Sequence, residues 1–208
     1  MTLTEPPNVE TMNEPTDDAL WMRVATGETE AFGVLFERHA RLIYNYLFRR
    51  TGDWSVAEDL TSVVFLEAYR RRASVDMQAG KVLPWLYGVA GNVLRNQRRS
   101  MRRYAAALSR LPAPDPELGI AGDAADRIDA ARQVRDVLRR LAQLSERDQE
   151  VIALCLWSDL SYEEAALALG IPVSAVRTRL SRARARLAAL GDVDAREHDA
   201  VSEGACES

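Results

Sequence analysis

One stretch near the C-terminus decides the fold, and it reads Leu160-Ser-Tyr-Glu-Glu-Ala-Ala-Leu-Ala-Leu-Gly-Ile-Pro-Val-Ser-Ala-Val-Arg-Thr-Arg-Leu-Ser-Arg-Ala-Arg184. Ser161 with Glu164 three residues later forms a capping box, which predicts the start of a helix. Gly170-Ile171-Pro172 predicts a tight turn, and apolar residues at helical spacing predict a last helix over 173–189. Two helices joined by a three-residue turn with glycine predict a helix-turn-helix.

The second of these helices has one apolar and one polar face. The apolar residues are Val176, Leu180, Ala183 and Leu187. The polar face, our candidate DNA-reading surface, consists of Ser174, Arg177, Thr178, Ser181, Arg182 and Arg184. Guanidinium groups match guanine O6 and N7 in the major groove, and hydroxyls reach bases or phosphates. A hairpin that only packs is the alternative, but such a hairpin does not need five arginines without an acid, so DNA reading is favoured.

Charge lies along the chain in islands of opposite sign, which the net charge of −4 hides. Positive charge gathers in residues 20–104 (+6) and 132–190 (+3). Negative charge gathers in residues 1–19 (−5), 105–131 (−3) and 191–208 (−5). Two stretches, Asn92–Ala107 and Pro172–Leu190, hold five arginines each and no acid. A solvated face in an arginine-biased composition explains either cluster alone equally well, but two clusters that each end an amphipathic helix favour a polyanion-binding surface.

Helical periodicity continues upstream, and no stretch alternates as a strand does. We predict helices over residues 17–25, 30–50, 55–72 and 84–103, with a loop at 73–82. Ser55 and Glu58 are the predicted capping box of the third helix. His39 lies on an apolar helical stripe and is expected to be a packed histidine. Trp85 is expected to bury its ring against the helix bundle rather than stack on DNA.

A change in composition marks a domain boundary after the fourth helix. Residues Leu111-Pro-Ala-Pro-Asp-Pro-Glu117 are rich in proline and acidic, which predicts an extended linker. In the second domain we predict a helix over 127–142 and another, capped by Ser145 with Asp148, ending at Trp157. The predicted all-α fold has two small helical domains joined by a flexible linker: disordered N-terminus 1–16, first domain 17–104, linker 105–126, second domain 127–190 and acidic tail 191–208.

Composition predicts a soluble, cytoplasmic protein without membrane insertion. The longest uncharged apolar run, residues 82–94, has 13 residues, fewer than the ~18 that a membrane span needs. The N-terminus carries acids and no basic residue, unlike a secretory signal. Two cysteines, Cys155 and Cys206, do not support a disulfide framework, and we expect no metal site and no cofactor.

The quoted stretch resembles the region 4 helix-turn-helix of sigma-70 family factors, specifically those of the extracytoplasmic-function (ECF) group. Upstream, Ala57-Glu58-Asp59-Leu60 with Phe65 resembles the region 2 helix that grips the RNA polymerase clamp. Trp85-Leu86-Tyr87-Gly88-Val89-Ala90-Gly91-Asn92 resembles the segment that leads into recognition of the promoter −10 element. The resemblance covers about 17–103 and 132–190, in the family's order, with a linker where longer sigma factors have a further domain.

The resemblance implies roles for named residues. Glu58, Asp59, Leu60 and Phe65 become candidates for polymerase binding, although Leu60 and Phe65 also suit the core and Glu58 a helix cap. Asn92, Asn96, Arg99 and Arg103 become candidates for −10 binding, and the polar face at 174–184 for −35 binding. The chain departs from the family at Ser62 and Val63, where Gln and Glu are frequent, and at Asn96, where Asp is frequent.

The resemblance also implies partners and a mechanism. Core RNA polymerase is the expected partner, through its β′ clamp for region 2 and its β flap for region 4, with promoter DNA and a probable anti-sigma factor. The two basic helices would hold promoter elements about two helical turns apart while few base contacts supply sequence specificity. The acidic tail is either an electrostatic brake on the basic helices or inert, and an inert tail is favoured.

Two other classes of function, a stand-alone DNA-binding regulator and an enzyme, fit the sequence less well. A helix-turn-helix regulator that binds duplex DNA without polymerase is disfavoured only by the region 2 resemblance. An enzyme is disfavoured because no catalytic triad, metal-ligand spacing or phosphate-binding loop occurs, and the only histidines are His39 and His198 in the tail. We therefore predict no catalytic residues.

Overall fold

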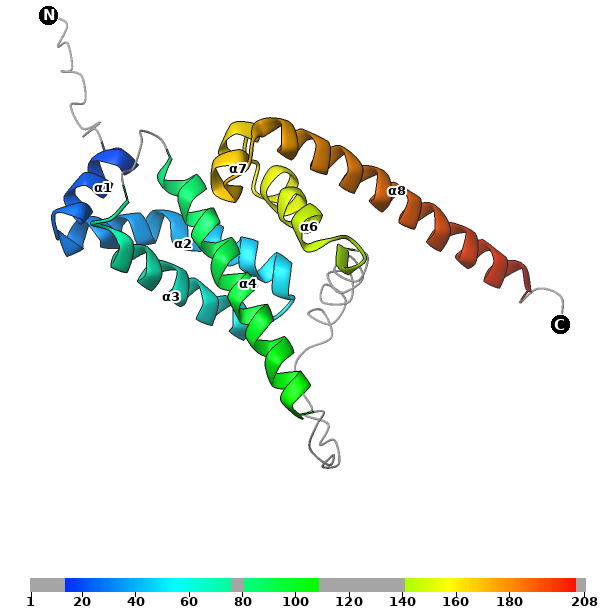
Figure 1. Cartoon of the computed structure of the whole chain (residues 1–208). Coiled ribbons are helices and arrows are strands. Elements are labelled where there is room, and N and C mark those ends of the chain that lie inside the picture. The colour runs from blue at the N-terminus through cyan, green and yellow to red at the C-terminus, as the bar shows by residue number, and fades with distance from the viewer. Residues whose placement is uncertain (1–13, 76–80, 109–140, 205–208) are drawn as a thin grey trace, which may run out of the picture.

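The structure is a computed structural model that describes residues 14–75, 81–108 and 141–204, with side chains up to residue 189 in the last helix. Every regular element in these ranges is helical: α1 (Asp17–Ala25), α2 (Thr29–Thr51), α3 (Trp54–Arg71), α4 (Val82–Leu108), α6 (Glu146–Ile152), the π-helical segment η1 (Ala153–Trp157), α7 (Tyr162–Leu169) and α8 (Val173–Gly204). Helices α1–α4 form an N-terminal module, and α6–α8 with η1 form a C-terminal module (Figure 1). The predicted all-α fold with two helical units is confirmed.

The N-terminal module is built around an apolar core to which all four helices contribute. Its least exposed side chains include Leu20, Leu35, Ile43, Leu47, Val64 and Leu86. The Trp85 ring lies edge-on to Trp21 at 4.9 Å between centroids, so it packs against the bundle as predicted. His39 is also packed, since it is 5 % exposed and its Nε2 lies 2.6 Å from Oδ2 of Asp17. This contact joins α2 to α1.

The turn between α2 and α3 differs from the prediction in its capping residue. Gly52 adopts the left-handed conformation (φ 69°) and its N–H donates to the Phe48 carbonyl, which ends α2. The carboxylate of Asp53 then accepts a hydrogen bond of 3.0 Å from the Val56 N–H. The predicted capping box of Ser55 and Glu58 is therefore wrong. Asp53 has the extended backbone that a cap requires, and its negative charge suits the positive end of the helix dipole.

The helix-turn-helix of the C-terminal module forms as predicted. Ser161 Oγ accepts from the Glu164 N–H at 3.2 Å, and Glu164 Oε2 accepts from the Ser161 N–H at 2.8 Å, which completes the capping box. Gly170 adopts φ 63° at the end of α7, a conformation that glycine enters without strain. Ser145 caps α6 through the Asp148 N–H, also as predicted. The apolar stripe of α8 is buried at Val176, Leu180 and Ala183.

Helix α8 runs past the predicted end near residue 189 and continues to Gly204. That prediction is wrong because Gly191 alone is a weak helix breaker, costing about 1 kcal/mol relative to alanine, and no proline follows it. Helix α4 likewise extends to Leu108, beyond the predicted residue 103. The predicted linker began at residue 105, but residues 105–108 belong to α4, and Thr16 of the predicted disordered N-terminus caps α1. Residues 1–13, 109–126 and most of the predicted helix at 127–142 lie outside the described residues. None of the described helices has the length and apolar character needed to cross a membrane.

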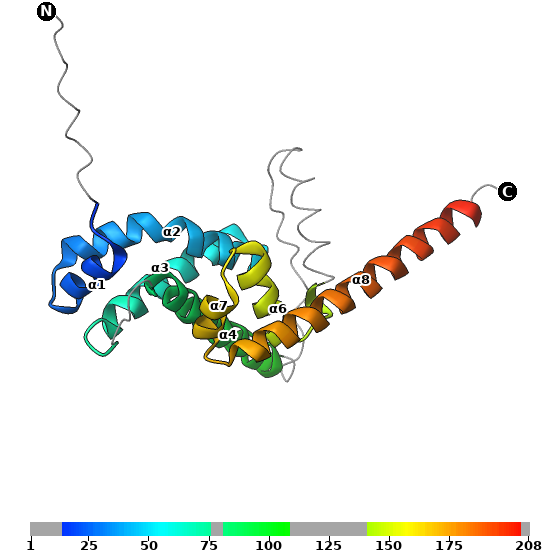
Figure 2. The same ribbon diagram turned by 90° about the horizontal axis from the view of Figure 1, so that it is seen from above.

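The two modules pack against each other, with α7 against α4 and η1 against α2 (Figure 2). Gly88 makes the close approach possible, because a methyl carbon at this position would lie 2.7 Å from the carbonyl oxygen of Ala168. Arg49 at the end of α2 donates from Nη1 to the Trp157 carbonyl at 2.7 Å. The sequence did not predict this contact between modules.

Candidate nucleic-acid and polymerase interface

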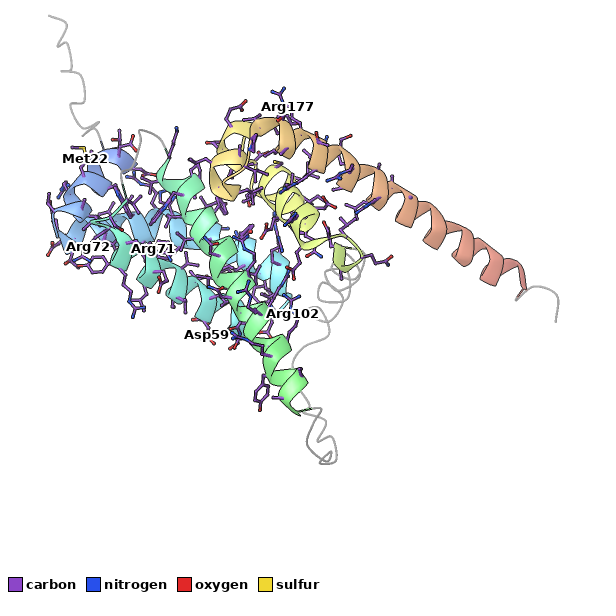
Figure 3. All side chains as sticks on the ribbon, in the orientation of Figure 1. Met22, Asp59, Arg71, Arg72, Arg102 and Arg177 are labelled. Atoms are coloured by element: carbon purple, nitrogen blue, oxygen red, sulfur yellow. The ribbon has the colours of Figure 1, made fainter. Side chains whose placement is uncertain are left out.

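The predicted reading face of α8 is exposed along its length. Ser174, Arg177, Thr178, Ser181, Arg182 and Arg184 are all exposed. The extensive contacts of α8 are with α6 and α7 of its own module. The Arg177 guanidinium lies 5.5 Å from the ring centroid of Tyr162 in α7, so a cation–π contact orients it (Figure 3). The face thus presents cations and hydroxyls to solvent on one side of a regular helix, with the dimensions that enter a major groove.

A second basic surface lies beside this face, in a groove of about 590 Å³ between α6 and α8. Asp148, whose side chain is 4 % exposed, accepts a hydrogen bond from Arg186 at 3.2 Å and lies 3.9 Å from Arg182. The arginines that line the groove are Arg147, Arg179, Arg182 and Arg186. Sequence reasoning missed Asp148 as an orienting group. The spacing of Arg179, Arg182 and Arg186, three and then four residues apart, could have indicated a second stripe on α8.

Helix α4 presents the four predicted −10 residues to solvent as one stripe. Asn92, Asn96, Arg99 and Arg103 are exposed and follow one another at four, three and four residues. That spacing places them on one face of the helix. Arg95 donates to Oδ1 of Asn92 at 2.5 Å, which orients the amide. The stripe combines amide and guanidinium donors without a carboxylate.

The other side of α4 faces the C-terminal module, and there Arg95 and Arg102 are paired with acids, whereas Arg98 donates to the Arg50 carbonyl at 2.9 Å. Arg95 forms an ion pair with Glu150, whose side chain is 9 % exposed. Arg102 Nη1 lies 3.0 Å from Oε1 of Glu146. The acid-free stretch of α4 therefore divides into a free polar stripe and a stripe whose acidic partners come from more than forty residues away. Local sequence could not show this, because the pairing depends on how the modules pack.

Helix α3 exposes its acids and buries its predicted apolar contacts. Glu58 and Asp59 are exposed, and Asp59 lies on the surface of the N-terminal module (Figure 3). Leu60 and Phe65 are only 5 % and 3 % exposed. Both belong to the core, so a partner that docks on α3 meets the carboxylates rather than these two side chains.

An exposed aromatic residue at the start of α3 was missed from the sequence. Trp54 is 65 % exposed and stacks on Phe48 at 3.9 Å between ring centroids. Tyr44 continues the stack, and loss of solvation together with the nearby Glu58 carboxylate raises the pKa of its hydroxyl. The position of Trp54 directly after the Gly52-Asp53 turn could have indicated this exposure, since a side chain at the first position of a helix often remains exposed to solvent.

Replacing Gly88 by alanine is expected to loosen the packing of the two modules. The added methyl would lie 2.7 Å from a backbone carbonyl oxygen, inside the about 3.5 Å contact distance of non-bonded heavy atoms. Overpacking of this kind costs about 1–3 kcal/mol. Small-angle X-ray scattering should show a larger radius of gyration for Gly88→Ala than for the wild type.

Gly33→Ala is the matched control for this experiment. Gly33 lies inside helix α2, and a methyl there meets no atom within 4 Å. We expect an unchanged radius of gyration and a stability gain of about 0.5–1 kcal/mol from the better helix former. Equal dimensions for Gly88→Ala and Gly33→Ala would contradict the close approach of α4 and α7.

Comparison with known families identifies both modules. The family described as Sigma-70 region 2 matches residues 35–104, and Sigma-70, region 4 matches residues 135–187. The RNA polymerase sigma factor HrpL of Pseudomonas syringae pv. syringae is 33 % identical over 147 residues, which cover 71 % of this chain and 79 % of HrpL. The ECF RNA polymerase sigma factor BldN of Streptomyces coelicolor is 31 % identical over 176 residues, covering 84 % of this chain and 65 % of BldN.

Solved structures share this architecture, and one of them is described as a sigma factor. CnrH, in complex with the cytosolic domain of CnrY, has a TM-score of 0.65 and 26 % identity, covering 86 % of this chain and 98 % of CnrH. The sigma factor RpoE, in complex with the anti-sigma factor NepR from Bartonella quintana, has a TM-score of 0.60 and covers 79 % of this chain and 99 % of RpoE. At 24 % identity, the second likeness concerns the fold alone.

Proposed function

Since the chain belongs to the sigma-70 family, as an ECF RNA polymerase sigma factor that directs transcription initiation, we propose how its surfaces divide that work. A sigma factor is a non-enzymatic initiation factor that binds core RNA polymerase. We assign −35 recognition to α8, −10 recognition to α4 and polymerase binding to α3. The cytoplasm, where the polymerase works, is the proposed location.

The assignment of −35 recognition rests on the exposed face of α8. Arg177 and Arg182 are candidates for reading guanine, and Ser174, Thr178, Ser181 and Arg184 for contacts to bases or phosphates. The groove between α6 and α8 adds Arg147, Arg179 and Arg186. We assign these arginines to phosphates, because guanidinium–phosphate contacts position a protein on DNA without reading its base sequence.

The assignment of −10 recognition rests on the stripe of Asn92, Asn96, Arg99 and Arg103. Amide and guanidinium donors at one exposed face suit both base edges and the phosphates of a separated strand. Unstacking of bases costs a few kcal/mol, which capture of a base by the protein offsets. The predicted loop at 73–82, which the resemblance aligns with base capture, lies outside the described residues at positions 76–80.

The proposed polymerase surface is the acidic side of α3. Exposed Glu58 and Asp59 suit a basic helix of the β′ clamp, and the exposed ring of Trp54 supplies apolar area beside them. The C-terminal module is proposed to bind the β flap. An anti-sigma factor is a further proposed partner, as the family resemblance implies.

Initiation on this scheme requires the two modules to separate. Two turns of duplex DNA span roughly 70 Å. Helix α4 contacts α7 near Gly88, and α8 follows directly after α7. At a rise of 1.5 Å per residue, Arg103 lies only about 22 Å along α4 from Gly88. The two reading faces are therefore too close, in the packed arrangement, to contact both elements of a straight promoter. We infer that binding to polymerase opens the contact between α4 and α7.

The observation that carries the proposal is the exposure of two polar stripes, on α4 and α8, while neighbouring arginines are paired within the protein. Run-off transcription with purified core polymerase on a promoter library tests it. We expect transcripts from a defined promoter class only when the chain is added. Tight sequence-specific binding to duplex DNA without polymerase, with no transcript, would instead favour a stand-alone helix-turn-helix regulator.

A further inference from the structure

A cavity of about 220 Å³ lies at the junction of the two modules, apart from both DNA-reading stripes. The N-terminal module contributes the end of α2 and Arg98 from the middle of α4, and the C-terminal module contributes η1, α6 and the residues before α6. The described residues that line it are Arg49, Arg50, Thr51, Arg98, Leu141, Ala142, Gln149 and Trp157. Three of these are arginines, and none is a carboxylate.

Arg50 is the unusual member of this set. It is 6 % exposed, and its Nε and Nη1 are buried without a hydrogen-bond partner. Leaving a buried donor unpaired costs about 1–3 kcal/mol, and more when the donor is charged. The other two arginines do have acceptors, since Arg49 donates to the Trp157 carbonyl at 2.7 Å and Arg98 to the Arg50 carbonyl at 2.9 Å.

The nearest described acids, Glu146 and Glu150, offset this positive charge only in part, because each is already paired with another arginine. Glu150 is engaged by Arg95, and Glu146 by Arg102. Burial first, and the charge of Arg50 second, lower the pKa of Arg98, although Glu146 and Glu150 act in the opposite direction. A helix C-terminus does favour cations, and Arg49 and Arg50 lie in the last turn of α2. That effect accounts for exposed arginines, but not for a buried guanidinium with unused donors.

We propose that this junction cavity binds a small oxyanion of the phosphate class, with Arg50 as its main ligand and Arg49 and Arg98 beside it. The planar fork of a guanidinium matches two oxygens of a phosphate, and its hydrogen bonds to an anion are strong. The cavity is smaller than the about 300–1,000 Å³ typical of drug-sized ligands, which favours a single phosphoryl group. Because both modules line the cavity, the anion holds them in the packed arrangement.

The test measures binding of inorganic phosphate to the full-length chain by isothermal titration calorimetry. A separate titration with chloride at matched ionic strength is the control. We expect one site in the wild type and at least a tenfold loss of affinity in Arg50→Gln. Arg98→Gln should weaken binding in the same direction, and it decides the question if Arg50→Gln does not fold by circular dichroism. Arg70→Gln, on the exposed surface of α3, should bind phosphate as the wild type does.

A second readout tests the link between the anion and the module packing. Phosphate should reduce the radius of gyration of the wild type, and it should bind at least tenfold more weakly to Gly88→Ala, in which the packing is loosened. Titration with adenosine monophosphate distinguishes the source of the phosphoryl group. Tighter binding than that of phosphate indicates a nucleotide ligand, and equal or weaker binding indicates free phosphate; either result supports the site.

The proposal is overturned if Arg50→Gln and Arg98→Gln, both folded, bind phosphate as the wild type does. It is also overturned if Arg182→Gln alone abolishes binding, since the phosphate would then occupy the DNA-binding groove. Neither outcome affects the assignment of promoter recognition to α4 and α8. Equally, failure of the transcription assay leaves the cavity and its test unchanged.

Discussion

Asp59→Arg is expected to lower the affinity for core RNA polymerase by on the order of 100-fold, which corresponds to about 2.7 kcal/mol. Asp59 is exposed on α3, so its replacement leaves the apolar core of the N-terminal module untouched. The physical reason for the loss is that the new cation would face the basic partner proposed for this surface, and like charges across an interface cost several kcal/mol. Fluorescence anisotropy of the labelled chain with core polymerase measures the effect.

The control for this variant is Glu37→Arg, which makes the same charge reversal at an exposed position of α2. We expect it to bind core polymerase within about threefold of the wild type, because surface charges away from an interface act weakly at physiological salt. Circular dichroism should give both variants wild-type unfolding temperatures. Undiminished affinity of a folded Asp59→Arg variant would remove α3 as the polymerase surface.

Arg177→Ala and Arg182→Ala are each expected to reduce transcription from the cognate promoter by about 5- to 150-fold, or about 1–3 kcal/mol, if the arginine reads a guanine. Both side chains are exposed on α8, so stability should hardly change. The cation–π contact with Tyr162 holds Arg177 in one orientation, which favours a specific base contact. Run-off transcription on the cognate promoter and on one with a scrambled −35 element measures the effect.

The comparison of the two promoters separates base reading from phosphate binding. If the arginine reads a base, its replacement should reduce transcription only from the cognate promoter. If the arginine contacts a phosphate, its replacement should reduce transcription from both promoters by the same factor. Arg182 is the more informative position, because its guanidinium lies 3.9 Å from the Asp148 carboxylate and shares it with Arg186. Arg41→Ala on α2 controls for the loss of one exposed positive charge.

The helix-turn-helix could be predicted from local sequence almost residue by residue. Its capping box, its left-handed glycine and its apolar stripe each depend on contacts within four residues, so the relevant physics is visible in a short window. The predictions that failed were also local ones. Asp53 competed with Ser55 for the cap of α3, and a single glycine did not stop α8 at residue 191.

Burial divided the predicted polymerase residues in a way that the motif alone could not. Glu58, Asp59, Leu60 and Phe65 were predicted together from their resemblance to one family helix. In the structure the two acids are exposed and the two apolar residues are in the core, because one face of α3 packs against α2. The acids alone therefore carry the proposed contact.

The sequence by itself determined the helical fold and the polar face of α8, since both follow from helical periodicity and the chemistry of neighbouring residues. The −10 residues of α4 and the order of the two modules followed from the resemblance to sigma-70 regions 2 and 4. Only the tertiary structure decided which arginines are free. It paired Arg95 with Glu150 and Arg102 with Glu146, and it left Nε and Nη1 of the buried Arg50 without an acceptor at the junction of the modules. Ion pairs between residues distant in sequence depend on how the two modules pack, and the periodicity of the sequence does not predict that packing.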